Sequence, residues 1–271
     1  MTITYRPCTT HDEFATVAQL EKTIWAVDDA DVITAHMLHV IHRIGGIVFG
    51  AFDGDTMVGM AVATPMQEQG LLWSHMAGVL PNYQGQDIGY QIKQVQRDWA
   101  LKHGYHEMRW SFDPAMRRNA NFNFRKLGVT TNIYHNNFYG MMSDGINAGV
   151  ASDRFEAVWR LNHPKITYDV PDDVSFLLTV GEQQLIINTT LTQPYHAVAC
   201  PYDFPAIKSE NLNIARMWRQ MMAKAFSVAF AGGYHVVDFV TEQDNQFCYY
   251  VLHNPEVHDV DNRYVGLSRL S

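Results

Sequence analysis

The sequence lacks the features that mark several classes of protein. It has only three cysteines among 271 residues, and their scattered positions, Cys8, Cys200 and Cys248, predict neither a disulfide framework nor a zinc site. No apolar run reaches the roughly 18 residues of a membrane-spanning helix. The N-terminus also has no cationic start followed by an apolar stretch, as a signal peptide would. We therefore expect no bound metal, no membrane partner and a cytoplasmic location.

Positive charge is also scarce. The chain has 20 Lys and Arg against 28 Asp and Glu, a formal net charge of −8, and no long basic run. Proteins that bind nucleic acid need clustered positive charge to neutralise phosphates, so we expect no nucleic-acid partner. The apolar content of 47% is ordinary for a globular protein, and the length suffices for one large or two ordinary domains.

One stretch, residues 71–104, combines the signals of a strand, a turn and a helix. An apolar run leads through Pro81 into a polar turn at residues 84–89, and apolar residues then recur at helical spacing, for example at Ile88 and Ile92. The first N–H groups of a helix have no partner within the helix, and the helix dipole adds partial positive charge there. The turn therefore predicts a phosphate site, although it matches neither a P-loop nor a G-x-G-x-x-G motif.

This turn resembles the pyrophosphate loop of the GNAT acyltransferase superfamily, whose pattern is Gln/Arg-x-x-Gly-x-Gly/Ala. Gln84 and Gly89 match its ends, and Asp87 stands where the family has its first glycine. Alone, the turn would be an ordinary strand-to-helix connection. A second segment, residues 119–129 with the sequence NANFNFRKLGV, is similar to a GNAT segment about thirty residues after the first. The two motifs, in this order and at this spacing, favour the acyltransferase fold.

The resemblance implies that acetyl-CoA or another acyl-CoA binds as a substrate. The strand before the turn looks like the splayed fourth strand of the GNAT fold, whose exposed backbone pairs with pantetheine. Aspartate tolerates a left-handed backbone better than most residues, so we expect the turn to survive at Asp87, although a carboxylate there opposes a pyrophosphate. The residues expected to bind the cofactor are Gly78, Val79, Gln84, Gly85, Gln86, Asp87, Ile88, Gly89, Tyr90 and Asn119.

Acylation of an amine by a thioester requires a base and donors for the oxyanion. The first candidate for the base is His75 on the expected fourth strand, because an ordinary histidine pKa near 6.5 suits the task. The alternative is a histidine hydrogen-bonded inside the sheet. Backbone N–H groups near Gly78 and Val79 are the expected oxyanion donors.

An acid must also reprotonate the thiolate that leaves. The tyrosine that GNAT enzymes often use falls on Phe124 in this pattern, and phenylalanine cannot donate a proton. The candidates for the acid are then Tyr134, His135 and Tyr139, in the region of an expected sixth strand. For each of these aromatic residues, packing in the core is the alternative.

Three residues further on are candidates for binding a polar substrate: Asp144, Asn147 and Arg154. Arg154 could hold a carboxylate through two parallel hydrogen bonds, or it could form a structural ion pair with Asp144 or Asp153. Residues 143–149, SDGINAG, resemble a signature of a two-domain GNAT subgroup whose members often appear beside enzymes of N-acylamino-acid metabolism.

We therefore expect an α+β fold with a mixed, mostly antiparallel sheet flanked by helices. Residues 1–160 are the expected GNAT acyltransferase domain. Residues 161–271 are expected to form a second, smaller α+β domain that shapes the pocket or an interface, and a homodimer is left open. The expected function is acyl transfer from acyl-CoA to the amine of a small molecule, which could be an amino acid. The alternative, favoured by Asp87 and Phe124, is an acyl-CoA-binding sensor or scaffold without turnover.

Overall fold

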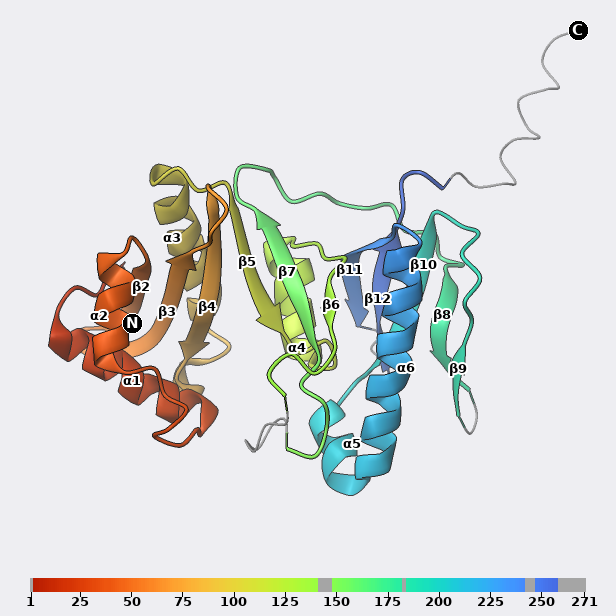
Figure 1. The fold of residues 1–271 in the computed structure, drawn as a ribbon, viewed down its shortest axis with the longest axis horizontal. Helices are drawn as coiled ribbons and strands as arrows, with labels where there is room; N and C mark the ends of the chain where they lie inside the picture. Colours follow the sequence, from red (N-terminus) through yellow and green to blue (C-terminus); the bar gives the residue numbers. More distant parts are fainter. Residues whose placement is uncertain (1, 141–147, 182–183, 242–246, 258–271) are drawn as a thin grey trace, which may run out of the picture. The chain divides into compact units, whose positions relative to one another are not determined.

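The computed structural model of the chain describes residues 2–140, 148–181, 184–241 and 247–257. Packing divides the chain into two compact units (Figure 1), of which unit 1 comprises Met1–Trp110 and Val158–Pro164. Unit 2 comprises Ser111–Ala157 and Lys165–Ser271. These units divide the chain by its packing, and the domain boundary expected at residue 160 stays a prediction.

Unit 1 is built on a sheet whose strands follow the chain in order. Neighbouring strands are antiparallel, apart from the last pair, which is parallel. A tight turn at Gly54, whose φ of 59° suits glycine, joins the second and third strands. The strands are β1 (Ile3–Pro7), β2 (Ile47–Asp53), β3 (Thr56–Pro65), β4 (Leu71–Val79) and β5 (Glu107–Phe112), the last of which ends in unit 2.

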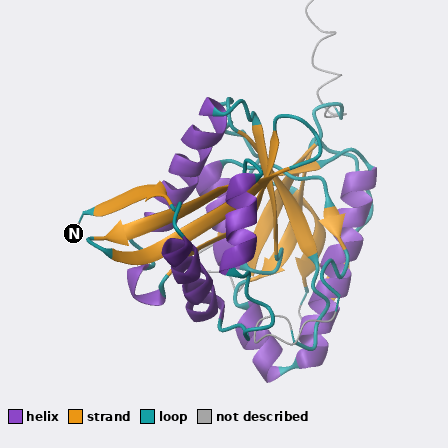
Figure 2. Cartoon of the chain, turned by 60° about the vertical axis from the view of Figure 1, so that its left-hand side comes forward, coloured by secondary structure: helices purple, strands orange, loops and turns teal. Residues whose placement is uncertain are grey.

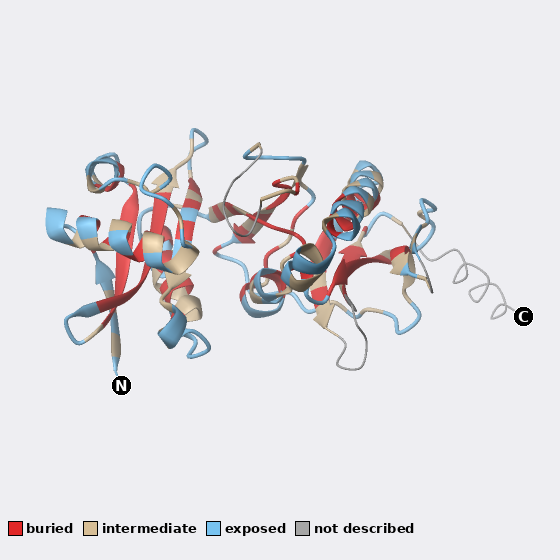
Figure 3. Ribbon diagram, turned by 90° about the horizontal axis from the view of Figure 1, so that it is seen from below, coloured by how far each residue is buried: buried red, intermediate tan, exposed pale blue. Residues whose placement is uncertain are grey.

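Helices cover both faces of this sheet. On one face α1 (His11–Trp25) and α2 (Ala35–Arg43) bury Phe14 and Leu38 against the strands. On the other face α3 (Ile88–Lys102) buries its apolar side chains. Figure 3 shows the resulting buried strands between more exposed helices.

Unit 2 contains a five-stranded sheet in the order β11-β12-β10-β8-β9, together with the short strand β6 (Tyr134–His135) and most of β7 (Arg154–Arg160). Its core is aromatic: Phe155, Phe226 and Tyr250 pack with ring centroids 4.6–5.4 Å apart. The sheet strands are β8 (Ser175–Val180), β9 (Leu185–Ile187), β10 (Tyr195–Pro201), β11 (His235–Thr241) and β12 (Phe247–His253). The helical elements are α4 (Arg117–Ala120), the π-helical η2 (Asn121–Leu127), α5 (Phe204–Glu210) and α6 (Leu212–Ala231) (Figure 2).

The expected fold class is confirmed: mostly antiparallel sheets are flanked by helices, and a further α+β part follows the first. The sequence pattern missed β7 and α5, because β7 follows a stretch rich in Gly, Ser, Asn and Asp, and α5 has only seven residues. The sixth strand, expected in the region of Tyr134, His135 and Tyr139, is reduced to Tyr134–His135. No helix within the described ranges is long and apolar enough to cross a membrane.

Candidate active site

The parallel pairing of β4 with β5 stops partway along both strands. It runs from Leu71, opposite Glu107, to Trp73, opposite Arg109, whereas β4 itself continues to Val79. In a strand, successive N–H and C=O groups point alternately to its two sides. Beyond Trp73, the side of β4 away from β3 therefore presents backbone groups that do not pair with β5. This is the geometry that the resemblance predicts for the fourth strand.

A β-bulge lies at the start of this unpaired stretch. Two consecutive residues of β3, Val62 and Ala63, pair with Met76 and Ser74, so that His75 is an extra residue in β4. Met76 packs in the core beneath α1 and α2, whereas the Ser74 hydroxyl bonds to Gln96 of α3. Because of the bulge, the side chains of Ser74 and Met76 point to opposite faces of the sheet, and His75 lies between these two residues.

The side chain of His75 is exposed, and none of the described residues hydrogen-bonds to its ring. Nearby protein atoms still remove part of the water around the ring, and this desolvation lowers the pKa of His75 below its ordinary value of 6.5. The imidazole is therefore mostly neutral at pH 7, as a general base must be.

The turn after β4 has the backbone of an anion-binding loop. Gly85 and Asp87 both have a left-handed backbone, with φ of 78° and 58°, so Asp87 adopts the conformation expected of it. Asp87 directly precedes α3, and its side chain does not cap the helix. The Gln84 side chain donates to the Val79 carbonyl over 3.0 Å, which ties the turn to the end of β4.

The N-terminus of α3 has room for a phosphate group. The first helical bond of α3 comes from the Gln91 N–H to the Asp87 carbonyl, so the N–H groups of Ile88, Gly89 and Tyr90 precede it and have no acceptor within the helix. A Cβ atom at Gly89 would meet only Val79 Cγ2, at 3.8 Å. The residues present therefore fit the pyrophosphate of CoA at the positive end of a 15-residue helix.

In unit 2, the candidate acid Tyr139 lies in the turn after β6 and not on a strand. Its side chain is exposed, and its hydroxyl lies 2.9 Å from Ser111 Oγ. Asn119, the remaining candidate for binding the cofactor, is exposed on α4.

Arg154 is buried at the start of β7, close to Tyr139. Its guanidinium carbon lies 5.3 Å from the Tyr139 ring centroid, and Nη1 donates to the Asp153 carbonyl over 2.8 Å. Nη1 also lies 4.0 Å from a carboxylate oxygen of Asp113. The other two candidates for binding the substrate, Asp144 and Asn147, lie outside the described residues.

The sequence matches a family model over part of its length. Residues 12–129 match the model of the Acetyltransferase (GNAT) family. This segment belongs to the GNAT acetyltransferases. The match covers the helices α1–α3, the β4 bulge and the phosphate turn, and it supports an acyl-CoA-dependent N-acyltransferase. GNAT acetyltransferases use acetyl-CoA or a related acyl-CoA as the donor and an amine as the acceptor.

Solved structures resemble part of this chain at low sequence identity. The N-acetyltransferase from Staphylococcus aureus Mu50 is 14% identical, with 60% of this chain and 100% of that chain covered and a TM-score of 0.50. The ribosomal-protein-S18-alanine N-acetyltransferase from Escherichia coli is 13% identical, with 60% and 96% covered and a TM-score of 0.49. No curated protein matches the sequence.

The weaker candidates for the acid, Tyr134 and His135, are occupied by other contacts. The Tyr134 hydroxyl donates to Asp153 over 2.7 Å, and burial together with the Asp153 carboxylate raises the Tyr134 pKa well above its ordinary value. The His135 ring lies 3.1 Å from the Glu156 carboxylate. Phe124, at the position of the family tyrosine, is buried edge-on against Phe112 and Tyr250.

The structure contains two buried polar clusters that the sequence alone does not predict. In unit 1, Lys93 of α3 is buried beside Ser74, although its place in the helix resembles that of any surface lysine. In unit 2, Asp113 pairs with Arg219, 106 positions later in the chain. No local sequence signal could have identified either cluster, because both depend on contacts between distant segments.

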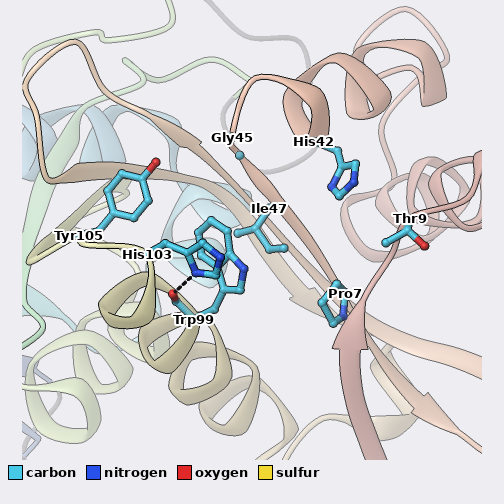
Figure 4. A pocket seen from close by; sticks show the side chains of 9 residues that line it. Pro7, Thr9, His42, Gly45, Ile47, Trp99, His103 and Tyr105 are labelled. Carbon is cyan, nitrogen blue, oxygen red and sulfur yellow. Dashed lines mark hydrogen bonds between the residues drawn. The ribbon is translucent and has the colours of Figure 1, made fainter.

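A cavity of about 520 Å³ opens in unit 1 at the carboxyl end of α3, at the opposite end of that helix from the phosphate turn (Figure 4). Trp99 and His103 stack there with ring centroids 4.1 Å apart, and the His103 ring bonds to the Trp99 carbonyl. Because α3 separates this cavity from the turn by its whole length, the cavity is not part of the phosphate turn.

Proposed function

We propose that this chain transfers an acetyl or related acyl group from acyl-CoA to the amine of a small molecule, with amino acids as the first class to test. The observation that carries the proposal is the bulge that presents an exposed His75, with a lowered pKa, at the start of the unpaired edge of β4. When bound, acyl-CoA supplies an activated carbonyl group. The protein must hold it, take a proton from the amine and stabilise the developing oxyanion.

In this proposal the phosphate turn and the backbone of β4 hold the donor. The positive end of α3 takes the pyrophosphate at Gly89, where a side chain is absent. The unpaired backbone groups of β4 accept an extended arm as an added strand would. Donors near Gly78 and Val79 then face the carbonyl group.

His75 acts as the base in the proposed reaction. Its ring is mostly neutral at pH 7, because desolvation lowers its pKa below 6.5, and no described residue competes for its nitrogen atoms. Tyr139 is the proposed acid, and its hydroxyl is held by Ser111.

Arg154 is the proposed anchor for a carboxylate on the acceptor, together with Asp144 and Asn147. The guanidinium is buried beside the exposed ring of Tyr139, where a charged hydrogen bond gains strength from low solvent exposure. The resemblance of residues 143–149 to a two-domain GNAT subgroup near N-acylamino-acid metabolism is part of the same proposal.

Release of free thiol from acetyl-CoA, measured with a panel of amines, tests this function. We expect turnover with amino acids and much less with the matching amino-acid amides, which lack the carboxylate. Arg154→Gln should reduce the difference between acid and amide. Similar rates with acids and amides in the parent would remove the carboxylate from the proposal, and no thiol release with any amine would favour binding without turnover.

The role of His75 is tested by the pH–rate profile. Activity should fall as pH drops through the pKa of His75, which lies below 6.5, because the protonated ring cannot accept a proton. His75→Gln should lose roughly two to four orders of magnitude in rate, with CoA affinity close to that of the parent. His163→Gln, at another exposed histidine of unit 1, serves as the control. A folded His75→Gln protein with the parental profile would exclude His75 as the base.

A further inference from the structure

Lys93 is a buried lysine without an acidic partner among the described residues. Lys93 is 3% exposed. In the described part of the chain, no carboxylate lies within ion-pair distance of its Nζ atom. Its neighbours are uncharged: Ser74 Oγ at 2.9 Å, Gln96 Oε1 at 3.2 Å, Met108 Sδ at 3.7 Å and the Trp110 ring centroid at 3.8 Å. A buried amine without a counter-ion is costly to keep, so its contacts should explain its presence.

The closest of these contacts is to Ser74, the residue directly before the bulge. Ser74 is 3% exposed. Its hydroxyl accepts from Lys93 Nζ and lies 3.2 Å from Gln96 Oε1, to which it donates. Ser74 is therefore attached at two points to α3, and both partners are buried on the same helix.

These bonds matter because a bulge can move along a strand. If β4 had no bulge, the pairing of Met76 with Val62 would continue with His75 opposite Ala63, on the face covered by α3. Ser74 would then turn to the face covered by α1 and α2. The bonds to Lys93 and Gln96 exist only when Ser74 faces α3. Because Met76 packs in the core beneath α1 and α2, the extra residue between the two is then His75.

We propose that Lys93 is a positioning residue: through Ser74 it fixes the β4 bulge at His75 and so sets where the His75 ring is presented. The catalytic consequence rests on the proposed role of His75 as the base, whereas the structural consequence does not. No charged group on β4, α3 or β5 is among the neighbours of Lys93. Desolvation lowers the pKa of Lys93 to about 7, and both the ammonium and the neutral amine can donate to Ser74. The anchor therefore works on both sides of neutral pH.

The test compares Lys93→Met with Lys102→Met, which changes an exposed lysine near the end of the same helix. The first measurement is the NMR titration of the His75 ring in the ligand-free protein, assigned by its loss in His75→Gln. We expect Lys93→Met to change the chemical shift and pKa of His75, and Lys102→Met to leave both unchanged. Ser74→Ala removes the same anchor from β4 and should reproduce the effect of Lys93→Met.

The second measurement separates kcat from KM. A displaced base should lower kcat about 10- to 100-fold in Lys93→Met, while KM for acetyl-CoA stays within about twofold because the phosphate turn is untouched. Unchanged His75 ring signals in folded Lys93→Met would overturn the proposal, even if His75→Gln is inactive. Altered ring signals combined with an active His75→Gln would support the anchor and reject His75 as the base. If Lys93→Met does not fold, the ring signals of Ser74→Ala decide the question alone.

Discussion

Asp113 and Arg219 form a buried, bidentate ion pair in unit 2, between the end of β5 and the middle of α6. Arg219 is 3% exposed and Asp113 is 7% exposed. Burial alone would lower the pKa of Arg219, but the Asp113 carboxylate outweighs it and raises that pKa. The next carbonyl, that of Pro114, accepts from the Tyr250 hydroxyl over 2.6 Å. Residues of α6 and β12, from the last third of the chain, therefore bond to Asp113 and Pro114, which lie in the segment that matches the GNAT family.

Arg219→Met should destabilise the protein by roughly 3–5 kcal/mol, because the buried Asp113 carboxylate loses its bidentate partner and keeps only Arg154, whose Nη1 lies 4.0 Å away. The control is Arg125→Met, which breaks an exposed pair with Asp238 and should cost less than about 1 kcal/mol. Denaturant unfolding of both variants measures the difference. Equal losses would mean that the Asp113–Arg219 pair contributes no more than a surface pair.

Gly89→Leu should weaken CoA binding about 10- to 100-fold without loss of stability. A side chain at Gly89 would occupy the space for the phosphate and block its charged hydrogen bonds, which are worth roughly 1.5–3 kcal/mol. Leucine also favours a helix over glycine by up to about 1 kcal/mol, and only Val79 lies near the added Cβ.

Calorimetry with CoA and thermal unfolding check this prediction. Gln91→Leu, two residues further along α3 at an exposed position, is the control and should bind CoA as the parent does. Unchanged affinity in Gly89→Leu would exclude this turn as the pyrophosphate site.

Asp87→Gly should tighten CoA binding, because it removes a negative charge beside the phosphate site. Glycine adopts the left-handed backbone of Asp87, φ 58°, without strain, so stability should change little. Asp87→Asn keeps the shape and removes the charge. If both variants bind more tightly, charge is the cause, whereas an effect confined to glycine would indicate size. Weaker binding in both would show that the carboxylate does not face the phosphate.

The free energy of unfolding of the parent protein should rise as pH increases above 7. Lys93→Met should lack this part of the increase. The folded-state pKa of Lys93 is about 7, against an ordinary 10.5, so between these values the unfolded chain holds a proton that the folded protein has released. Unfolding free energy increases with pH wherever the unfolded state binds more protons.

Each pH unit in that window is worth about 1.4 kcal/mol, so the parent should gain roughly 2–3 kcal/mol relative to Lys93→Met between pH 6 and pH 9. Urea unfolding at both pH values measures this gain. Parallel stability curves for the two proteins would show that Lys93 keeps an ordinary pKa.

Local patterns in the sequence predicted the strand, turn and helix of residues 71–104, which the structure forms as β4, the phosphate turn and α3. The apolar run before Pro81 identified β4, and the apolar spacing at Ile88 and Ile92 identified α3. The replacement of the family tyrosine by Phe124 was also evident. These features depend on residues within one turn or one strand of each other, where side-chain periodicity and backbone preference are already visible.

Only the tertiary structure decided how His75 is presented and what surrounds it. The bulge exists only in the register between β3 and β4, Lys93 is buried only because α3 packs over Ser74, and Arg219 meets Asp113 across 106 positions. Nothing in the residues near Lys93 or Arg219 distinguishes a buried charge from a solvated one. That difference depends on which distant segments exclude water from the charged group, and packing alone decides it.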